Sequence, residues 1–167
     1  MAKKDQLEGK KVLIVDDEPD VLETLAELLP MCDVVKASSF EEAENAMNRA
    51  AFDIVVLDIM GVDGYRLLDI AKEKKLTAVM LTAHALSVED TKKSYIKGAD
   101  FYVPKDEMTN IAAFLNDVLD AQEKGKSTWR RWMERLEWYY DNRFGPGWQN
   151  SDKEFWDNIM TKRDKGL

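Results

Sequence analysis

The sequence predicts an α/β protein in which five alternating strand and helix segments form a doubly wound parallel sheet, (βα)5, followed by a C-terminal helical tail. Five short apolar runs, rich in β-branched residues, have the length of buried strands. A stretch with helical periodicity follows each run, which is typical of a parallel sheet with helices on both faces. All five tryptophans lie after residue 121, so a second composition begins there.

Capping residues indicate where the first two helices begin. Pro19 fits the first turn of a helix that runs to about Leu29. Ser39 stands three residues before Glu42, which is the capping-box pattern at the start of a second helix. The strands of the sheet are predicted at residues 11–16, 33–37, 53–58, 77–82 and 100–103.

The three later helices carry similar signals. The pair Asp63-Gly64 opens the third helix, and Ser87 is placed to cap the fourth. Gly98 suits the left-handed residue that ends a helix. The fifth helix is predicted from about residue 108 to residue 121, with apolar residues recurring on one side.

The chain is therefore expected to form a first domain over residues 1–121 and an aromatic-rich helical extension over residues 122–167. In the extension, helices are predicted over 128–142 and after Ser151 or Asp152, separated by the segment FGPG. Two short helices are too small to bury that much aromatic surface alone. We expect them to pack on the first domain or on a second copy of the chain, and regulated partner binding is the second interpretation.

Composition excludes several classes of protein. A chain of 167 residues is too short for a large multi-domain enzyme. The net charge of −8 argues against a nucleic-acid partner, and the net +2 of the extension only weakly supports stacking of its aromatics on a single strand. The single cysteine, Cys32, excludes an internal disulfide. The sequence has neither a membrane-spanning apolar run nor a secretory signal, so we expect a cytoplasmic protein without a membrane partner.

Polar residues stand at the carboxyl ends of four predicted strands, and these ends lie side by side in a parallel sheet. They are Asp16, Asp17 and Glu18 after the first strand, Asp58 at the end of the third, Thr82 at the end of the fourth, and Lys105 after the fifth. Carboxylates this close repel one another unless a cation offsets their charge, and Mg²⁺ prefers such oxygen ligands. Each residue alone has a simpler explanation, such as helix-dipole compensation or a turn cap. Four such placements at one edge favour a functional site.

The segments VLIVDDEP, VVLDIM, DGYRLL, VMLTA and KGADFYVPK resemble the receiver domains of two-component response regulators, over about residues 10–121. The resemblance implies a flavodoxin-like fold with strand order 2-1-3-4-5 and the single-receiver architecture of chemotaxis proteins. It also implies that the chain is not an enzyme with an external substrate, because receivers catalyse only their own phosphorylation and dephosphorylation.

The same resemblance implies a role for each matching residue. Asp58 would be the phosphoacceptor and a metal ligand, Asp17 a direct Mg²⁺ ligand, Asp16 an acidic partner that holds Mg²⁺ through water, and Met60 a ligand through its backbone carbonyl. In addition, Thr82 would hydrogen-bond the phosphoryl group, Lys105 would form an ion pair with it, and Tyr102 would turn inward on activation.

The implied partners are a sensor histidine kinase or phosphotransfer protein. Output is expected through the face formed by helix 4, strand 5 and helix 5, or through the tail, toward an effector or a second copy of the chain. The physical requirements of phosphoryl transfer agree with these roles, because an in-line nucleophile, a cation and a fixed positive charge suffice.

Two features depart from the family pattern. Receivers usually have a proline after the lysine, whereas here Pro104 precedes Lys105, which leaves the aim of the lysine and the lifetime of the phosphorylated state open. The loop IMGVDG is about two residues shorter than usual and lacks its proline, and Gly61 is expected to supply the needed backbone freedom. The only histidine, His84, is expected to be a loop residue near the mouth of the site.

Two other classes of function stay open at this point. A small Mg²⁺-dependent phosphohydrolase would use the same aspartyl-phosphate chemistry, but it would need a general acid two residues after Asp58, where Met60 stands. A constitutive scaffold would keep the site and act through its tail, in which case partner binding would not depend on Asp58.

Overall fold

The computed structural model describes residues 5–83 and 87–161, with the side chain of Thr161 left out. The chain divides into two compact units, whose bounds are Met1–Asn116 and Asp117–Leu167. The second unit begins five residues before the composition changes at residue 122. No helix within the described ranges is both long enough and apolar enough to cross a membrane. His84 lies outside the described residues, so its expected place near the site is untested.

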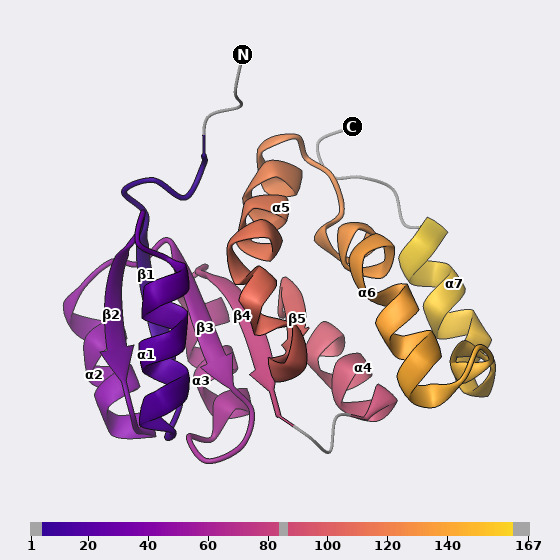
Figure 1. Ribbon diagram of the computed structural model, residues 1–167, viewed down its shortest axis with the longest axis horizontal. Coiled ribbons are helices and arrows are strands. Elements are labelled where there is room, and N and C mark those ends of the chain that lie inside the picture. The colour runs from indigo at the N-terminus through magenta and orange to yellow at the C-terminus, as the bar shows by residue number, and fades with distance from the viewer. Residues whose placement is uncertain (1–4, 84–86, 162–167) are drawn as a thin grey trace. The chain divides into compact units, whose positions relative to one another are not determined.

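The first unit is built on a five-stranded parallel sheet with the order β2-β1-β3-β4-β5 (Figure 1). Its strands are β1 (Lys11–Val15), β2 (Asp33–Ala37), β3 (Ile54–Asp58), β4 (Thr77–Thr82) and β5 (Phe101–Pro104). Every strand agrees with its predicted range to within one residue at each end. The predicted α/β fold, its strand order and its C-terminal helices are confirmed.

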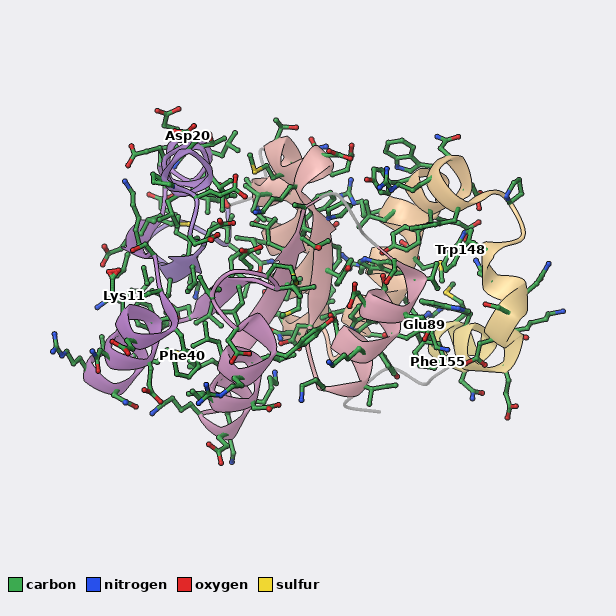
Figure 2. All side chains as sticks on the ribbon, turned by 90° about the horizontal axis from the view of Figure 1, so that it is seen from below. Lys11, Asp20, Phe40, Glu89, Trp148 and Phe155 are labelled. Carbon is green, nitrogen blue, oxygen red and sulfur yellow. The ribbon has the colours of Figure 1, made fainter. Side chains whose placement is uncertain are left out.

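Helices cover both faces of this sheet, with α1 on one face and α2 and α3 on the other (Figure 1). In chain order they are α1 (Pro19–Leu28), α2 (Phe40–Arg49), α3 (Gly64–Glu73), α4 (Val88–Ile96) and α5 (Ile111–Glu123), with a 3-10 turn, η1 (Lys105–Asn110), before α5. The predicted fifth helix therefore starts later than expected, because its first turn has the tighter 3-10 form. Charged residues such as Asp20 lie on the outer surface of α1 (Figure 2).

The predicted caps are present. Ser39 Oγ accepts a hydrogen bond from the Glu42 amide at 3.2 Å, and Ser87 Oγ accepts one from the Asp90 amide at 3.0 Å. The Glu42 carboxylate accepts a hydrogen bond from the amide of Ser38 rather than from that of Ser39, so the capping box is shifted by one residue. The caps satisfy amides that would otherwise have no partner at a helix end.

The core of the first unit lies in the central strands. All five residues of β3 are buried, as are most residues of β1, β4 and β5. Strand β2 forms an edge of the sheet, and only Ala37 of its residues is buried. Burial of central strands on both faces is expected where helices cover a parallel sheet, and it fixes the strand ends that carry the polar residues.

The second unit contains the last residues of α5 followed by three further elements. These are α6 (Thr128–Phe144), the 3-10 turn η2 (Trp148–Asp152) and α7 (Lys153–Thr161). Ser127 Oγ accepts a hydrogen bond from the Arg130 amide at 3.3 Å at the start of α6, and Gly145, with φ of 89°, follows its end. Asp152 Oδ1 accepts a hydrogen bond from the Phe155 amide at 3.3 Å, as the predicted cap requires.

Aromatic rings form the core of this second unit. Trp132 lies 5.0 Å from Tyr140 and 6.0 Å from Trp156, measured between ring centroids. Trp148 lies 4.9 Å from Tyr140 and 4.8 Å from Trp156. Its place on η2, between α6 and α7 in the chain, can be followed in Figure 2. Trp138, by contrast, is 51% exposed. The four buried rings therefore contact one another rather than standing singly on separate helices.

Candidate functional site

The register of the sheet places the predicted polar residues at one edge. Val15 pairs with Leu57, so Asp16 follows β1 at the level where Asp58 ends β3. Asp58 pairs with Leu81, and Thr82 pairs with Pro104, which directly precedes Lys105. The strand ends therefore bring together side chains that are far apart in the sequence.

The Lys105 ammonium is the cationic centre of this edge. Its Nζ lies 2.8 Å from Asp16 Oδ2, 3.3 Å from Glu18 Oε1 and 3.4 Å from Asp58 Oδ1. The side chains of Asp16, Asp58 and Lys105 are 0%, 5% and 12% exposed. Glu18 is 58% exposed, so the strongest attraction on the ammonium comes from the two buried carboxylates, Asp16 and Asp58.

Three acidic residues after β1 form the other part of the site. One carboxylate oxygen from each of Asp16, Asp17 and Glu18 lies within 4.8 Å of the others. The second oxygen of Asp16, Oδ1, accepts a hydrogen bond from the Glu18 amide at 2.9 Å. Asp16 is thereby fixed, whereas Asp17 and Glu18 are exposed.

Two glycines allow close packing at this edge, one beside the Asp17 carboxylate and one beside the backbone of Asp58. Gly61 has φ of 81°, and a Cβ there would lie 2.5 Å from Asp17 Oδ2. The expectation that Gly61 supplies backbone freedom in the short loop agrees with this conformation. At Gly64 a Cβ would lie 2.1 Å from the backbone oxygen of Asp58, so the start of α3 packs directly against the end of β3.

Burial and like charge alter the acidity of the two buried carboxylates. Burial, reinforced by the charges of Asp16 and Asp17, raises the pKa of Asp58 to about 7, although Lys105 acts in the opposite direction. Burial also raises the pKa of Asp16, and its hydrogen bond with Lys105 only partly offsets this. Burial opposes the charge of Lys105, but Asp16, Asp58 and Glu18 outweigh it and raise the pKa of the ammonium.

The site therefore fits a hard divalent cation. The Lys105 ammonium contacts the carboxyl groups of Asp16, Glu18 and Asp58, and Asp17 lies beside Asp16 and Glu18, which leaves an excess of negative charge when all four are ionised. Their oxygens are the donor type that Mg²⁺ prefers, and Gly61 leaves space beside Asp17. The acidic cluster is the kind of site that such a cation needs, and the individual magnesium ligands named from the sequence stay a prediction.

The remaining predicted residues lie as follows. Thr82 is buried at the end of β4, and Tyr102 on β5 is fully buried. Met60, two residues after Asp58, is 74% exposed. Glu18 contacts Lys105 although no role was assigned to it from the sequence; its position directly after Asp16 and Asp17 was the available signal.

These features define a class of protein, a doubly wound α/β domain with an acidic site around one lysine at the carboxyl edge of its sheet. The family model for the response regulator receiver domain matches residues 12–116. The chain belongs to the response regulator receiver domain family, as the resemblance in the sequence indicated.

Individual relatives agree with this assignment. The chain is 37% identical over 103 residues to the two-component response regulator ARR18 of Arabidopsis thaliana, with 58% of this chain and 16% of that protein covered. It is 42% identical over 101 residues to the probable transcriptional regulator ycf27 of Guillardia theta, with coverages of 58% and 39%. The chain thus spans less than half the length of these relatives.

Solved structures show the same fold. A CheY-like receiver domain protein of Methanospirillum hungatei has a TM-score of 0.63 and 27% identity, covering 70% of this chain and 98% of that one. The response regulator DrrB of Thermotoga maritima has a TM-score of 0.60 and 30% identity, with coverages of 68% and 54%.

The family defines the general role of the chain. It carries a receiver domain of two-component signalling, a family whose members are typically phosphorylated, bind Mg²⁺, and interact with histidine kinases and effectors. The match ends at residue 116, so the second compact unit lies outside it.

Proposed function

We propose that this chain is a phosphorylation switch in which Asp58 accepts a phosphoryl group from a sensor histidine kinase or a phosphotransfer protein. The observation that carries the proposal is the contact of the buried Asp58 carboxylate with Lys105, at 3.4 Å, beside the acidic cluster that follows β1. A nucleophile, a fixed positive charge and ligands for a divalent cation are the groups that phosphoryl transfer requires.

In this proposal Asp16, Asp17, Asp58 and the backbone carbonyl of Met60 hold Mg²⁺, Asp16 through water. When bound, Mg²⁺ neutralises negative charge on the transferring phosphoryl group. Without a cation these carboxylates repel one another, so binding of Mg²⁺ would relieve this repulsion.

The protein's own side chains perform the remaining steps. An oxygen of ionised Asp58 attacks the phosphorus of a phosphohistidine, a new P–O bond forms, and the P–N bond breaks with its electron pair leaving on the imidazole. Lys105 then pairs with the new phosphoryl oxygens, whose charge is about −1.5 to −2. Thr82 donates its hydroxyl hydrogen to one of these oxygens, and Tyr102 occupies the space behind it in the active state.

The chain acts as a signalling protein in this proposal and catalyses only its own phosphorylation and dephosphorylation. The receiver function resides in residues 1–121, and the extension over residues 122–167 is a separate output region. Output passes by protein contacts, through the face of α4, β5 and α5 or through the extension, to an effector or a second copy of the chain. We place this activity in the cytoplasm, where histidine kinases present their phosphoryl groups.

Beryllofluoride, which mimics a bound phosphoryl group, tests the proposal. With Mg²⁺ present it should shift the NMR signals of Thr82, Lys105 and Tyr102 in the wild type and leave Asp58→Ala unchanged. Asp20→Ala is the matched control, because Asp20 is an exposed acidic residue on α1. An unchanged wild-type spectrum at saturating beryllofluoride and Mg²⁺ contradicts the proposal. A phosphohydrolase would instead turn over a phosphomonoester steadily.

A further inference from the structure

Helix α5 contributes to both compact units. It runs from Ile111 to Glu123, and the boundary between the units falls between Asn116 and Asp117. The element before it, η1, begins at Lys105 itself. A continuous path of backbone therefore leads from the lysine of the proposed site into the second unit.

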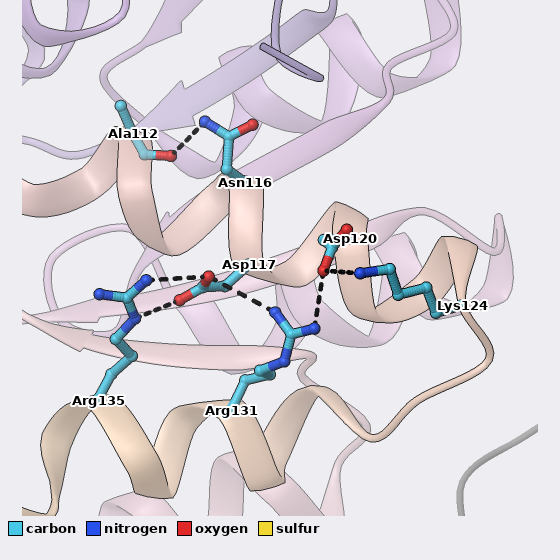
Figure 3. A network of polar contacts seen from close by, with 7 residues as sticks. All are labelled: Ala112, Asn116, Asp117, Asp120, Lys124, Arg131 and Arg135. Atoms are coloured by element: carbon cyan, nitrogen blue, oxygen red, sulfur yellow. Dashed lines mark hydrogen bonds and ion pairs between the residues drawn. The ribbon is translucent and has the colours of Figure 1, made fainter. Parts of the chain in front are cut away.

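Two buried carboxylates on the last turns of α5 are bound by arginines of α6 (Figure 3). Arg135 donates to Asp117 with Nε at 2.6 Å and with a terminal nitrogen at 3.2 Å, one bond to each carboxylate oxygen. Arg131 donates to Asp120 Oδ2 at 2.7 Å and lies 3.6 Å from Asp117 Oδ1. We call these four residues the α5–α6 clamp. Lys124 adds a weaker contact with Asp120 at 3.2 Å.

The geometry of the clamp makes it a specific connection. Asp117 and Asp120 are three residues apart and Arg131 and Arg135 are four apart, so each pair lies on one face of its helix. The two aspartates are only 9% and 7% exposed. A bidentate arginine on a buried carboxylate holds both distance and orientation, and its loss leaves an uncompensated buried charge.

Other residues of α6 pack into the aromatic core. Trp132 follows Arg131 directly and contacts Tyr140 on the same helix and Trp156 on α7. Helix α6 thus contacts α5 through the two arginines and α7 through Trp132, so its side chains connect the end of α5 to the aromatic core. Around Asp117 and Asp120 the surface of α5 is occupied by this chain's own α6.

We propose that residues 117–167 are the output module of this receiver, and that the α5–α6 clamp couples them to the state of the site through Lys105, η1 and α5. This inference rests on the proposed phosphorylation switch. In this proposal the C-terminal part of α5 is covered by α6 of the same chain. An external partner therefore binds α6 and α7 rather than this part of α5.

Hydrogen exchange of the full-length chain tests the coupling. Saturating Mg²⁺ and beryllofluoride should change the protection of α6 amides at least about threefold in wild type, because local opening follows the stability of the unit. In the double variant Arg131→Gln, Arg135→Gln this change should disappear, while the signals of Thr82 and Lys105 respond as in wild type. The matched control is Arg143→Gln, an exposed arginine on the same helix.

Each outcome decides the matter. If beryllofluoride shifts the signals of Thr82 and Lys105 in wild type but leaves the protection of the α6 amides unchanged, the coupling is refuted and the phosphorylation switch stands. An α6 response that survives in the double variant refutes the clamp as the route. If no part of the wild-type chain responds, the phosphorylation switch itself fails. All five tryptophans lie in the second unit, so their fluorescence reports whether this unit stays folded in the double variant. If the double variant unfolds, the same experiment is done with the single variant Arg131→Gln.

Discussion

Replacing Asp58 by asparagine should make the receiver unit more stable, and the gain should grow as the pH rises. The cause is the raised pKa of Asp58, which burial moves from 3.8 to about 7. Between about pH 4 and pH 7 the unfolded chain has released this proton while the folded chain retains it. The free energy of unfolding therefore falls by about 1.4 kcal/mol for each pH unit in this window, and the loss is complete above the folded-state pKa.

The magnitude follows from the size of the shift. The full difference between the two pKa values corresponds to about 4 kcal/mol, and no large reduction for solvent screening applies because the side chain is 5% exposed. Between about pH 5 and about pH 8, the free energy of unfolding of the wild type should fall by about 3 kcal/mol, and that of Asp58→Asn should not show this fall. With a urea dependence of about 1–3 kcal/mol per molar, the midpoints of the two proteins should separate by about 1 M or more over this range.

The assay is urea unfolding of both proteins with a metal chelator present. Far-UV circular dichroism follows both units, and tryptophan fluorescence identifies the transition of the second unit, because all five tryptophans lie there. A stability difference that stays constant between the two pH values refutes the argument that burial of ionised Asp58 is costly. If Asp58→Asn instead stabilises the protein more at the lower pH than at the higher pH, the pH dependence has the opposite sign and the argument is refuted as well.

Two further predictions concern the acidic cluster and the loop after β3. Mg²⁺ at about a hundred times its dissociation constant should raise the free energy of unfolding by about 3 kcal/mol, and Asp17→Asn should lose more than half of this at the same concentration, whereas Asp20→Asn keeps it. An equal effect of Mg²⁺ on Asp17→Asn, measured by urea unfolding, would exclude Asp17 as a ligand. Gly64→Ala should destabilise the protein by about 2 kcal/mol or more, because its Cβ meets the Asp58 backbone at 2.1 Å. Gly147→Ala, which meets only the flexible Asn150 side chain at 3.0 Å, should cost far less, and equal losses would contradict the steric reasoning.

The sheet and most of the site followed from the sequence for a physical reason. Central strands buried on both faces are continuous apolar runs, so their ends are visible as the first polar residues, such as Asp16 and Asp58. Parallel pairing then requires that these ends meet. The Lys105 contact with Glu18 was not foreseen, because a side chain in an acidic run gives no sign of its direction.

The start of the second unit was harder to locate for a different reason. Asp117 and Asp120 have the spacing of exposed charges on an amphipathic helix, and nothing in α5 itself distinguishes them from solvated residues. Their partners, Arg131 and Arg135, lie beyond the loop that the composition marks as the boundary. Ion pairs between helices depend on packing, so the composition at residue 122 and the contacts at residue 117 give different boundaries.

The order Pro104-Lys105 removes the proline that usually follows the lysine, yet the lysine is fixed in another way. Three carboxylates surround its Nζ at 2.8, 3.3 and 3.4 Å, and an ammonium has three hydrogens to donate. Its direction is thus set by charge rather than by the peptide that follows it. Protonation of Asp58, whose pKa is about 7, weakens one of the three attractions, so the position of the Lys105 ammonium depends on the protonation state of Asp58.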